Sequence, residues 1–423
     1  MILERIIMIL EKINGFVWGG GLIFLLLFTG TVLTIRLKFI QLRLPILLLK
    51  NGKSQNSGLS QLKTVCMSLG TTMGTGNIVG AASALALGGA GSIFWMWVSA
   101  FLGMSIVYAE NVLSAKYSDK TLKGPMAYIS KGLGFPALGA IFAVFCVLAS
   151  LGMGGMVQVN TFTEALGNCT DFSRPVAALV IFLLIMLTVH GGGERIGTAA
   201  QYLLPAASAA YAAVCVAAIV IYKERLPEVF RSIFSEAFDF RSAAGGIFGY
   251  ALSVGIRRGI FSNEAGLGSS PILHSAAETS SPHTQGLWSM FEVFFDTILC
   301  CTLTAVTVLC GSESFSVTEA VSAALGSYSD TFITAELGIF AFCTVIGWYY
   351  CGMTAFSHIS KGRYIGIFAA VYSCFAASGA IFSSETLWTL SDIFNGLMAF
   401  PNLLAILLLM PKIKDHTSKN SND

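Results

Sequence analysis

A short polar run lies within an otherwise apolar stretch of the chain. Residues 68–80 read SLGTTMGTGNIVG, which places one serine, three threonines and Asn77 within ten residues. Bare amide and hydroxyl groups are costly in hydrocarbon, so such a cluster persists where it lines a wet cavity or a ligand. Gly74 and Gly76, with one residue between them, allow a helix to unwind. Unwinding frees carbonyl groups that suit Na⁺ and N–H groups that suit a carboxylate, and a zwitterionic amino acid needs both kinds of partner.

Other ligand classes fit this polar run less well. The glycine spacing is G-x-G-x-x-x-G, and no strand precedes it, so it does not match a nucleotide-binding loop. The sequence has no P-loop, no G-x-S-x-G and no zinc motif, which argues against a membrane enzyme. A channel would more naturally show a short repeated filter than one asymmetric polar cluster.

Four acidic residues lie in apolar stretches, namely Glu110, Glu292, Asp296 and Asp392. A buried acid in a membrane is a candidate functional group, and a protonated carboxyl group can carry H⁺ coupling. Asp296 follows Glu292 by four residues, so both side chains face the same way on a helix. The alternative, which the sequence favours, is structural pairing or a position near the end of a span.

The remaining titratable groups give weaker signals. Arg257, Arg258 and Glu264 suit either a gate on the cytoplasmic side or a cap of a broken helix. The five histidines have no metal-ligand spacing, so we assign them no metal role. The ten cysteines include no C-x-x-C, and nine lie in or beside apolar runs, so we interpret them as small core residues.

Membrane-spanning helices must position these groups. Of the 423 residues, 55% are hydrophobic and 11% are charged, and the mean hydropathy is +0.73. Soluble domains are typically about 25% charged, so the composition argues against a set of soluble domains. Residues 15–35 carry no charge, are too long for a signal-peptide core and lack a cleavage site, so we expect a retained span. No basic stripe lies outside the membrane-flanking loops, which argues against a nucleic-acid partner.

Eleven stretches are long enough to cross a bilayer, which requires about 20 apolar residues in a helix. The predicted spans are 14–35, 64–88, 92–115, 135–166, 175–192, 196–222, 243–273, 284–310, 332–358, 363–382 and 386–411.

The charges of the connecting loops predict the orientation. Sixteen of the 25 Lys and Arg residues fall on one side, and these are Arg36, Lys38, Arg43, Lys50, Lys53, Lys63, Lys116, Lys120, Lys123, Lys131, Arg195, Lys361, Arg363, Lys412, Lys414 and Lys419. Seven fall on the other side, namely Arg5, Lys12, Arg174, Lys223, Arg225, Arg231 and Arg241. The positive-inside rule places the first side in the cytoplasm of a cell-membrane protein, with the N-terminus outside and the C-terminus inside.

The spans divide into two sets of five once the first is set apart. Each set begins with a glycine-interrupted helix, with Gly70, Gly74, Gly76 and Gly80 in one, and Gly245, Gly246, Gly249, Gly255 and Gly259 in the other. Paired interrupted segments are typical of inverted-repeat secondary transporters, although glycine also simply lets membrane helices pack closely. The predicted division is an extra N-terminal helix with a basic cytoplasmic loop (1–59), a first repeat (60–222), an extracellular loop (223–242), a second repeat (243–411) and a cytoplasmic tail (412–423).

Four segments carry a family resemblance. Residues 88–103 read GGAGSIFWMWVSAFLG, residues 259–269 read GIFSNEAGLGS, residues 74–78 read GTGNI, and residues 401–403 read PNL. They resemble the GGPGA-x-FWMW, RGLFSNEAGMGS, GTGNI and MAIPNL segments of the alanine or glycine:cation symporter family, within the amino acid–polyamine–cation transporter superfamily. The similarity runs from about residue 60 to 411. It implies an all-α polytopic membrane protein with about 11 transmembrane helices, built on a 5+5 inverted-repeat core of the leucine-transporter type with discontinuous helices.

The resemblance also implies binding residues. For the substrate these are Thr72, Gly74, Thr75, Gly76 and Asn77 in the polar run, Gln158 and Asn160 in a Q-x-N match, and Trp348, which either walls the pocket or lies at the lipid interface. For sodium they are the carbonyls of Gly70 and Met73 and the side chains of Cys343 and Thr344. Cys343 stands where the family has serine, and a thiol is a soft, poor ligand for Na⁺.

The expected function is therefore symport rather than catalysis. A small neutral amino acid, alanine or glycine, would move with Na⁺ by alternating access. The alternative is an H⁺-coupled symporter or an exchanger of the same fold. The expected partners are the amino acid and the lipid bilayer, and no obligate protein partner is inferred.

Overall fold

The computed structural model describes residues 2–51, 61–238, 249–276 and 281–413. Within these ranges every regular element is a helix. Lys53, Arg241, Gly245, Gly246, Lys414, His416 and Lys419, which figure in the sequence analysis, lie outside them.

The helices follow one another without a strand in the described ranges. The α-helices are α1 (Ile2–Val17), α2 (Gly20–Arg36), α3 (Leu44–Asn51), α4 (Gln61–Thr72), α5 (Ala81–Gly88), α6 (Gly91–Tyr117), α7 (Gly124–Ala127), α8 (Pro136–Ala149), α9 (Gln158–Cys169), α10 (Arg174–Val189), α11 (Gly192–Ile221), α12 (Leu226–Glu236), α13 (Tyr250–Asn263), α14 (Ser270–His274), α15 (Pro282–Val293), α16 (Thr302–Gly311), α17 (Val317–Leu325), α18 (Ser329–Ser360), α19 (Ile365–Ser378) and α20 (Ser384–Leu409). Four π-helical segments interrupt or join them, namely η2 (Gly76–Gly80), η3 (Tyr128–Gly132), η4 (Ser150–Val157) and η7 (Phe294–Cys301).

Seven helical stretches in the described ranges are long and apolar enough to cross a membrane. These are Met8–Arg36, Gly91–Tyr117, Pro136–Cys169, Gly192–Ile221, Pro282–Gly311, Val317–Ser360 and Ser384–Lys412, and three shorter apolar helices are Gly76–Gly88, Arg174–Val189 and Ile365–Ser378. The predicted all-helical, multi-pass architecture agrees with this set.

Some predicted boundaries differ from the structure. The stretch Met8–Arg36 begins earlier than the span predicted at 14–35, and it contains a short break between α1, which ends at Val17, and α2, which begins at Gly20. The loop predicted at 223–242 contains α12, which Pro227 starts and which buries Val229 and Ile233 along one face. The loop is predicted as the stretch between two apolar spans, and the spacing of four residues between Val229 and Ile233 suits an amphipathic helix within it.

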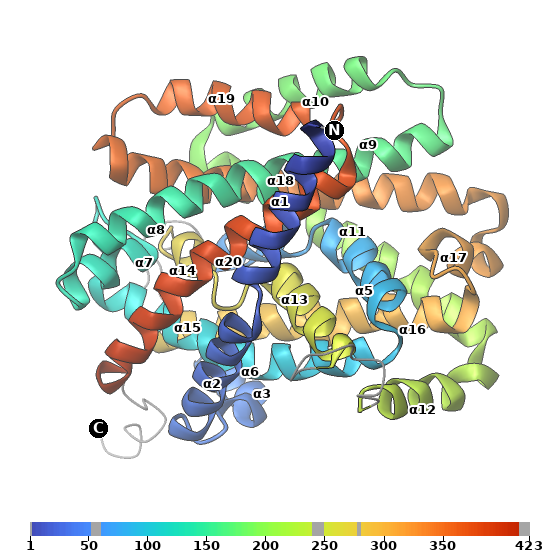
Figure 1. The fold of residues 1–423 in the computed structure, drawn as a ribbon, viewed down its shortest axis with the longest axis horizontal. Helices are drawn as coiled ribbons and strands as arrows, with labels where there is room; N and C mark the ends of the chain where they lie inside the picture. Colours follow the sequence, from blue (N-terminus) through green and yellow to red (C-terminus); the bar gives the residue numbers. More distant parts are fainter. Residues whose placement is uncertain (1, 52–60, 239–248, 277–280, 414–423) are drawn as a thin grey trace.

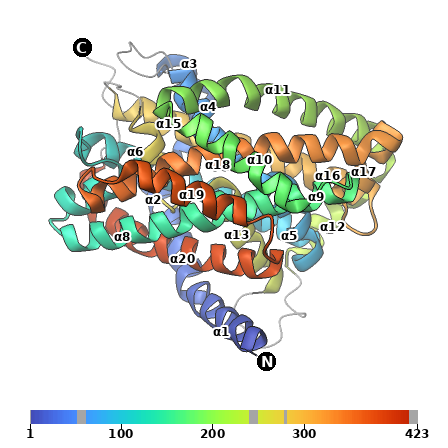
Figure 2. The same cartoon turned by 90° about the horizontal axis from the view of Figure 1, so that it is seen from above.

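The long helix α18 organises the interior. It packs against α4, α8, α9 and α11, and its central position is visible in Figure 1. Helices α10 and α19 pack together along one side of the bundle, and α1, which contacts α20, extends away from the bundle in Figure 2. The interrupted segment α4–η2–α5 lies inside this arrangement, since residues 64–77 are buried throughout.

Candidate functional site

The polar run interrupts its helix as the two glycines predict. α4 ends at Thr72, and the amide of Met73 makes its last regular bond, to the carbonyl of Leu69 (2.6 Å). The amide of Gly74 turns back to the carbonyl of Thr72 (2.9 Å), and that of Asn77 bonds the carbonyl of Gly74 (3.3 Å) before η2 continues. The backbone of residues 73–75 therefore leaves the regular helical ladder, as expected of a ligand-binding interruption.

Gln158 of α9 faces this break. Its side-chain oxygen accepts hydrogen bonds from both the amide and the hydroxyl of Thr75, each at 3.0 Å. Its amide nitrogen donates to the carbonyl of Met153 (3.1 Å), which fixes the orientation of the side chain. Gln158 therefore contacts the break directly, and its role in substrate binding stays a prediction.

Gly74 is confined by two polar side chains. A Cβ atom built on Gly74 would lie 2.6 Å from the hydroxyl oxygen of Thr344 and 2.8 Å from the side-chain oxygen of Gln158. Real Cβ atoms do not approach oxygen so closely, so α18 and α9 close around the bare backbone at this position. Gly76 is less crowded, because its Cβ would meet the ring of Phe261 at 3.4 Å.

Three of the four predicted sodium-site residues meet between α4 and α18. The hydroxyl of Thr344 donates to the carbonyl oxygen of Gly70 (2.9 Å), and the Cβ atom of Cys343 lies 3.3 Å from the position of a Cβ on Gly70. Met73 follows one turn later, where its sulfur accepts a long hydrogen bond from Ser208 (3.9 Å). The oxygen atoms of Gly70 and Thr344 suit a hard cation, whereas the Cys343 thiol does not.

Asn77 joins the break to a buried carboxylate. Its amide nitrogen donates to the Oδ1 atom of Asp296 (2.8 Å) and to the backbone carbonyl of the same residue (3.1 Å). The other carboxylate oxygen accepts from the hydroxyls of Ser262 (2.6 Å) and Thr297 (2.9 Å). The side-chain oxygen of Asn77 is buried without a hydrogen-bond partner. Of the two interpretations of Asp296, structural pairing and a proton carrier, the pairing is observed, and its partner Asn77 belongs to the candidate site itself.

Glu292 makes the corresponding contacts on the other side of the break. It accepts a hydrogen bond from the hydroxyl of Ser68 in α4 (2.6 Å), and the Nε2 atom of His274 lies 2.9 Å from its Oε1 atom. Glu292 and Asp296 thus both face the interrupted segments, as their four-residue spacing predicts. His274 carries no signal in the sequence, because its partners are 11 and 18 residues away in a different helix.

A second interruption follows α13. Glu264 adopts the left-handed conformation (φ 57°) and ends the helix, so the predicted capping role is confirmed. Its carboxylate is buried and accepts hydrogen bonds from the hydroxyl of Ser269 and from the indole N–H of Trp348 (2.8 Å). Arg257 pairs with Asp392 (2.6 Å) rather than with Glu264, and the alternative of a gate formed by Glu264 and the arginines stays a prediction.

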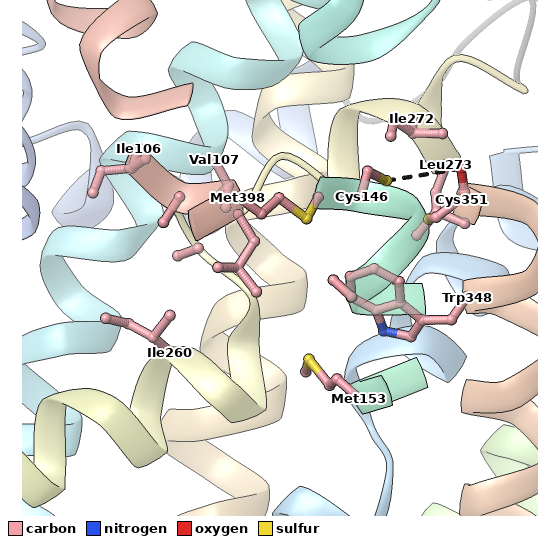
Figure 3. Packing of buried hydrophobic residues seen from close by; sticks show 14 of the residues in the cluster. Ile106, Val107, Cys146, Met153, Ile260, Ile272, Leu273, Trp348, Cys351 and Met398 are labelled. Atoms are coloured by element: carbon pink, nitrogen blue, oxygen red, sulfur yellow. Dashed lines mark hydrogen bonds between the residues drawn. The ribbon is translucent and has the colours of Figure 1, made fainter. Parts of the chain in front are cut away.

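Trp348 is a core residue, so the lipid-interface alternative is wrong. Its side chain is fully buried and lies beside Met153 in the packing shown in Figure 3. A Cβ atom on Gly154 would lie 2.2 Å from the Cβ of Trp348, so the backbone of the π-helical segment η4 packs closely against the Trp348 side chain. Trp348 therefore connects α18, η4 and the second interruption.

The side chains of two predicted substrate residues, Asn160 and Thr72, bond groups other than the backbone of residues 73–75. The amide of Asn160 donates to the carbonyls of Gly379 and Phe382 (both 2.9 Å), in the connection between α19 and α20. The hydroxyl of Thr72 is turned back onto its own helix, to the carbonyl of Leu69 (3.2 Å). Their role in substrate binding stays a prediction.

The comparisons with known proteins decide the family. The model of the sodium:alanine symporter family matches residues 3–422. The chain belongs to the sodium:alanine symporter family. It is therefore a membrane transporter, and the resemblance found in its sequence motifs is confirmed.

Relatives within this family align over nearly the whole chain. An uncharacterized transporter of Haemophilus influenzae is 39% identical, over 97% of this chain and 95% of its own length. The sodium/alanine symporter AgcS of Methanococcus maripaludis is 36% identical, over 97% of this chain and 96% of its own. The probable sodium/glutamine symporter GlnT of Bacillus subtilis is 36% identical, over 98% and 91% respectively.

Proposed function

We propose that this member of the sodium:alanine symporter family imports a small neutral amino acid, alanine or glycine, together with Na⁺ by alternating access. The proposal includes about 11 transmembrane helices, with two inverted repeats at 60–222 and 243–411, and an outer N-terminus. Relatives named for alanine and for glutamine make a neutral amino acid the common substrate class.

The break at residues 73–75 is the observation that carries the proposal. Peptide groups outside the helical ladder are held against Gln158 and Thr344 in the interior of the protein. A zwitterion needs donors for its carboxylate and acceptors for its ammonium, and an interrupted helix supplies both from its own backbone. Thr75, Gly76 and Asn77 begin the second half-helix, and their N–H groups are the proposed donors to the carboxylate. Because the amides of Thr75 and Asn77 already bond Gln158 and Gly74, a bound carboxylate would replace these partners.

Sodium would bind on the α18 side of the same break. The carbonyls of Gly70 and Met73 and the hydroxyl of Thr344 are the oxygen donors proposed for it. The hydrogen bond from Thr344 to Gly70 holds α4 and α18 together, and a bound cation would be coordinated by the same two oxygen atoms. Cys343 would contribute a weaker donor than a serine, so we expect modest Na⁺ affinity.

H⁺ coupling is the second candidate, and one contact favours it. Asp296 is a buried carboxylate bonded to Asn77, so its protonation would change the partner of a proposed substrate residue. A buried acid placed in this way inside a transporter is a candidate proton carrier.

Uptake into proteoliposomes tests the proposal. Labelled alanine or glycine should accumulate only with an inward Na⁺ gradient, and Asn77→Ala should abolish the accumulation, whereas the exposed control Asn168→Ala should retain it. A counterflow panel that includes glutamine, run in Na⁺ and in choline, identifies the amino acid and the ion. Uptake that is indifferent to Na⁺ but driven by a pH gradient would favour the H⁺ candidate, and no uptake of any neutral amino acid would refute both.

A further inference from the structure

A cleft beside the second interrupted segment contains Arg258, whose Nη1 atom has no hydrogen-bond partner among the described residues. The cleft has a volume of about 320 Å³ and is lined by Asn14, Val79, Ser83, Arg257, Arg258, Ser384, Glu385, Trp388, Thr389 and Asp392. Sites for small molecules typically begin at about 300 Å³. Most of the lining side chains are polar or charged, which suits a polar solute rather than a lipid chain.

The two arginines of the cleft differ in their partners. Arg257 forms an ion pair with Asp392, with 2.6 Å between the Nη2 and Oδ2 atoms. The Nη1 atom of Arg258 is buried and has no hydrogen-bond partner, and its guanidinium group lies over the ring of Trp388, 4.7 Å from the centroid. An aromatic face holds a guanidinium group in place without using its N–H donors. Arg258 is therefore positioned with donors to spare.

An uncommitted anion lies in the same cleft. Glu385 is exposed and forms no ion pair with another described residue. Glu385, Trp388 and Asp392 follow one another at spacings of three and four residues on α20, so they share one face of that helix. Among the described residues, the cleft thus holds a guanidinium group, that of Arg258, and a carboxylate, that of Glu385, that form no ion pair.

The cleft adjoins the break in α4 through two aromatic rings in contact, which are tilted by 32° to each other. Trp388 packs against Phe261, with 4.7 Å between ring centroids, and Phe261 lies 3.4 Å from the position of a Cβ on Gly76. Val79, two residues after Asn77, also lines the cleft. A solute in the cleft is therefore separated from the candidate site mainly by the rings of Phe261 and Trp388.

From these contacts we propose that the cleft is a second, staging site for a free zwitterionic amino acid. Arg258 binds the α-carboxylate by a charge-assisted, two-pronged contact, and Glu385 attracts the α-ammonium group. Movement of Phe261 and Trp388 then admits the amino acid to the break at residues 73–75. This inference rests on the proposed amino-acid transport and extends it to the entry route.

Transport kinetics in intact cells, with the amount of protein at the surface measured, test the staging site. For the amino acid that the wild type takes up, Arg258→Gln should raise KM about tenfold and change kcat less than twofold. Arg258→Lys keeps the charge but loses the planar fork, so its KM should rise about threefold, as should that of Glu385→Gln. The exposed control Arg231→Gln, on α12, should leave both constants unchanged.

Substrate analogues separate carboxylate binding from a purely structural role. An amino alcohol, in which a hydroxymethyl group replaces the carboxylate, should inhibit the wild type and Arg258→Gln equally. If Arg258→Gln weakens inhibition by the amino alcohol as much as it raises KM for the amino acid, or lowers kcat alone, then Arg258 does not bind the carboxylate and the inference is wrong. A wild type that takes up no amino acid would instead refute the proposed function.

Discussion

Glu292 and Asp296 lie four residues apart on the continuous helix of α15 and η7, and they are hydrogen-bonded to opposite sides of the same helix break. Glu292 accepts from Ser68, before the break, and Asp296 accepts from Asn77, after it. The same two acids also contact the second interrupted segment on either side of its break, through His274 and Ser262. One helix thus ties together both halves of both interrupted segments. If the angle between the two halves of an interrupted segment changes, either these hydrogen bonds break or the helix of α15 and η7 moves with the segment.

Replacing Asp296 by asparagine tests this connection with little change in side-chain volume. The amide cannot accept from Asn77, Ser262 and Thr297 at once, and a hydrogen bond to a charged group contributes about 1.5–3 kcal/mol. We expect Asp296→Asn to lower the initial rate of amino-acid uptake at least tenfold. Uptake close to that of the wild type would show that the carboxylate is dispensable.

The Trp348 indole is expected to contribute to stability through Glu264. Trp348→Phe retains an aromatic ring but leaves the buried carboxylate of Glu264 without the N–H donor, at a cost of about 1.5–3 kcal/mol. The apparent melting temperature in detergent should fall by several degrees. Trp97→Phe is the matched control, because the Trp97 indole donates to the uncharged hydroxyl of Thr302 and its loss should cost about 1 kcal/mol. Equal shifts in both variants would contradict the assignment.

Cys343 provides a test of the ion site. Cys343→Ser replaces a thiol by a smaller hydroxyl beside Gly70 and Thr344, where an oxygen donor suits a hard cation better. The Na⁺ concentration for half-maximal uptake should decrease severalfold, while the KM for the amino acid at saturating Na⁺ stays within twofold. An unchanged or raised Na⁺ requirement would place the cation elsewhere.

In the loop after α6, we expect the protection of the Leu122 amide from hydrogen exchange to depend on pH through Asp119. The pKa of Asp119 is held well below its usual value of 3.8 by Lys131, and by the amides of Thr121 and Leu122, which donate to its carboxylate at 2.7 Å. Because the folded state lowers this pKa, the carboxylate's contribution is complete above the unfolded value and is lost as the pH falls towards the folded value. Amide exchange at Leu122, corrected for its intrinsic rate, should thus be constant from pH 5 to 8 and increase below about pH 4. Loosening that begins near neutral pH would contradict this assignment.

The local interruption of α4 could be predicted from sequence because its causes are local. Polar side chains in an apolar span, with Gly74 and Gly76 beside them, are sufficient to predict unwinding. The partners of the break could not be predicted in the same way. Asp296 is 219 residues from Asn77, and a carboxylate paired at a site has the same sequence signature as one at the end of a span. Only the tertiary structure distinguishes a carboxylate that is paired at a site from one that lies at the end of a span.

Trp348 and α12 show two further limits. Trp348 follows Thr344 by four residues, which predicts that both lie on the same face of a helix. The spacing does not predict the partner of Trp348, because Glu264 lies 84 residues away in the sequence. α12 lies between two predicted spans and is too short to cross a bilayer, so a search for spans assigns its residues to a loop. The composition indicated a membrane protein correctly, because charge content averages over the whole chain and does not depend on any single boundary.

Equilibrium binding to two glycine variants of the interrupted segment tests the central claim most directly. A methyl group on Gly74 would meet Thr344 and Gln158 at less than 3 Å, whereas one on Gly80, in the same segment, would meet nothing within 4 Å. Purified Gly74→Ala should lose Na⁺-dependent binding of labelled alanine or glycine, and Gly80→Ala should retain it, with both proteins folded. Wild-type affinity in Gly74→Ala would show that the amino acid does not bind at the break in α4.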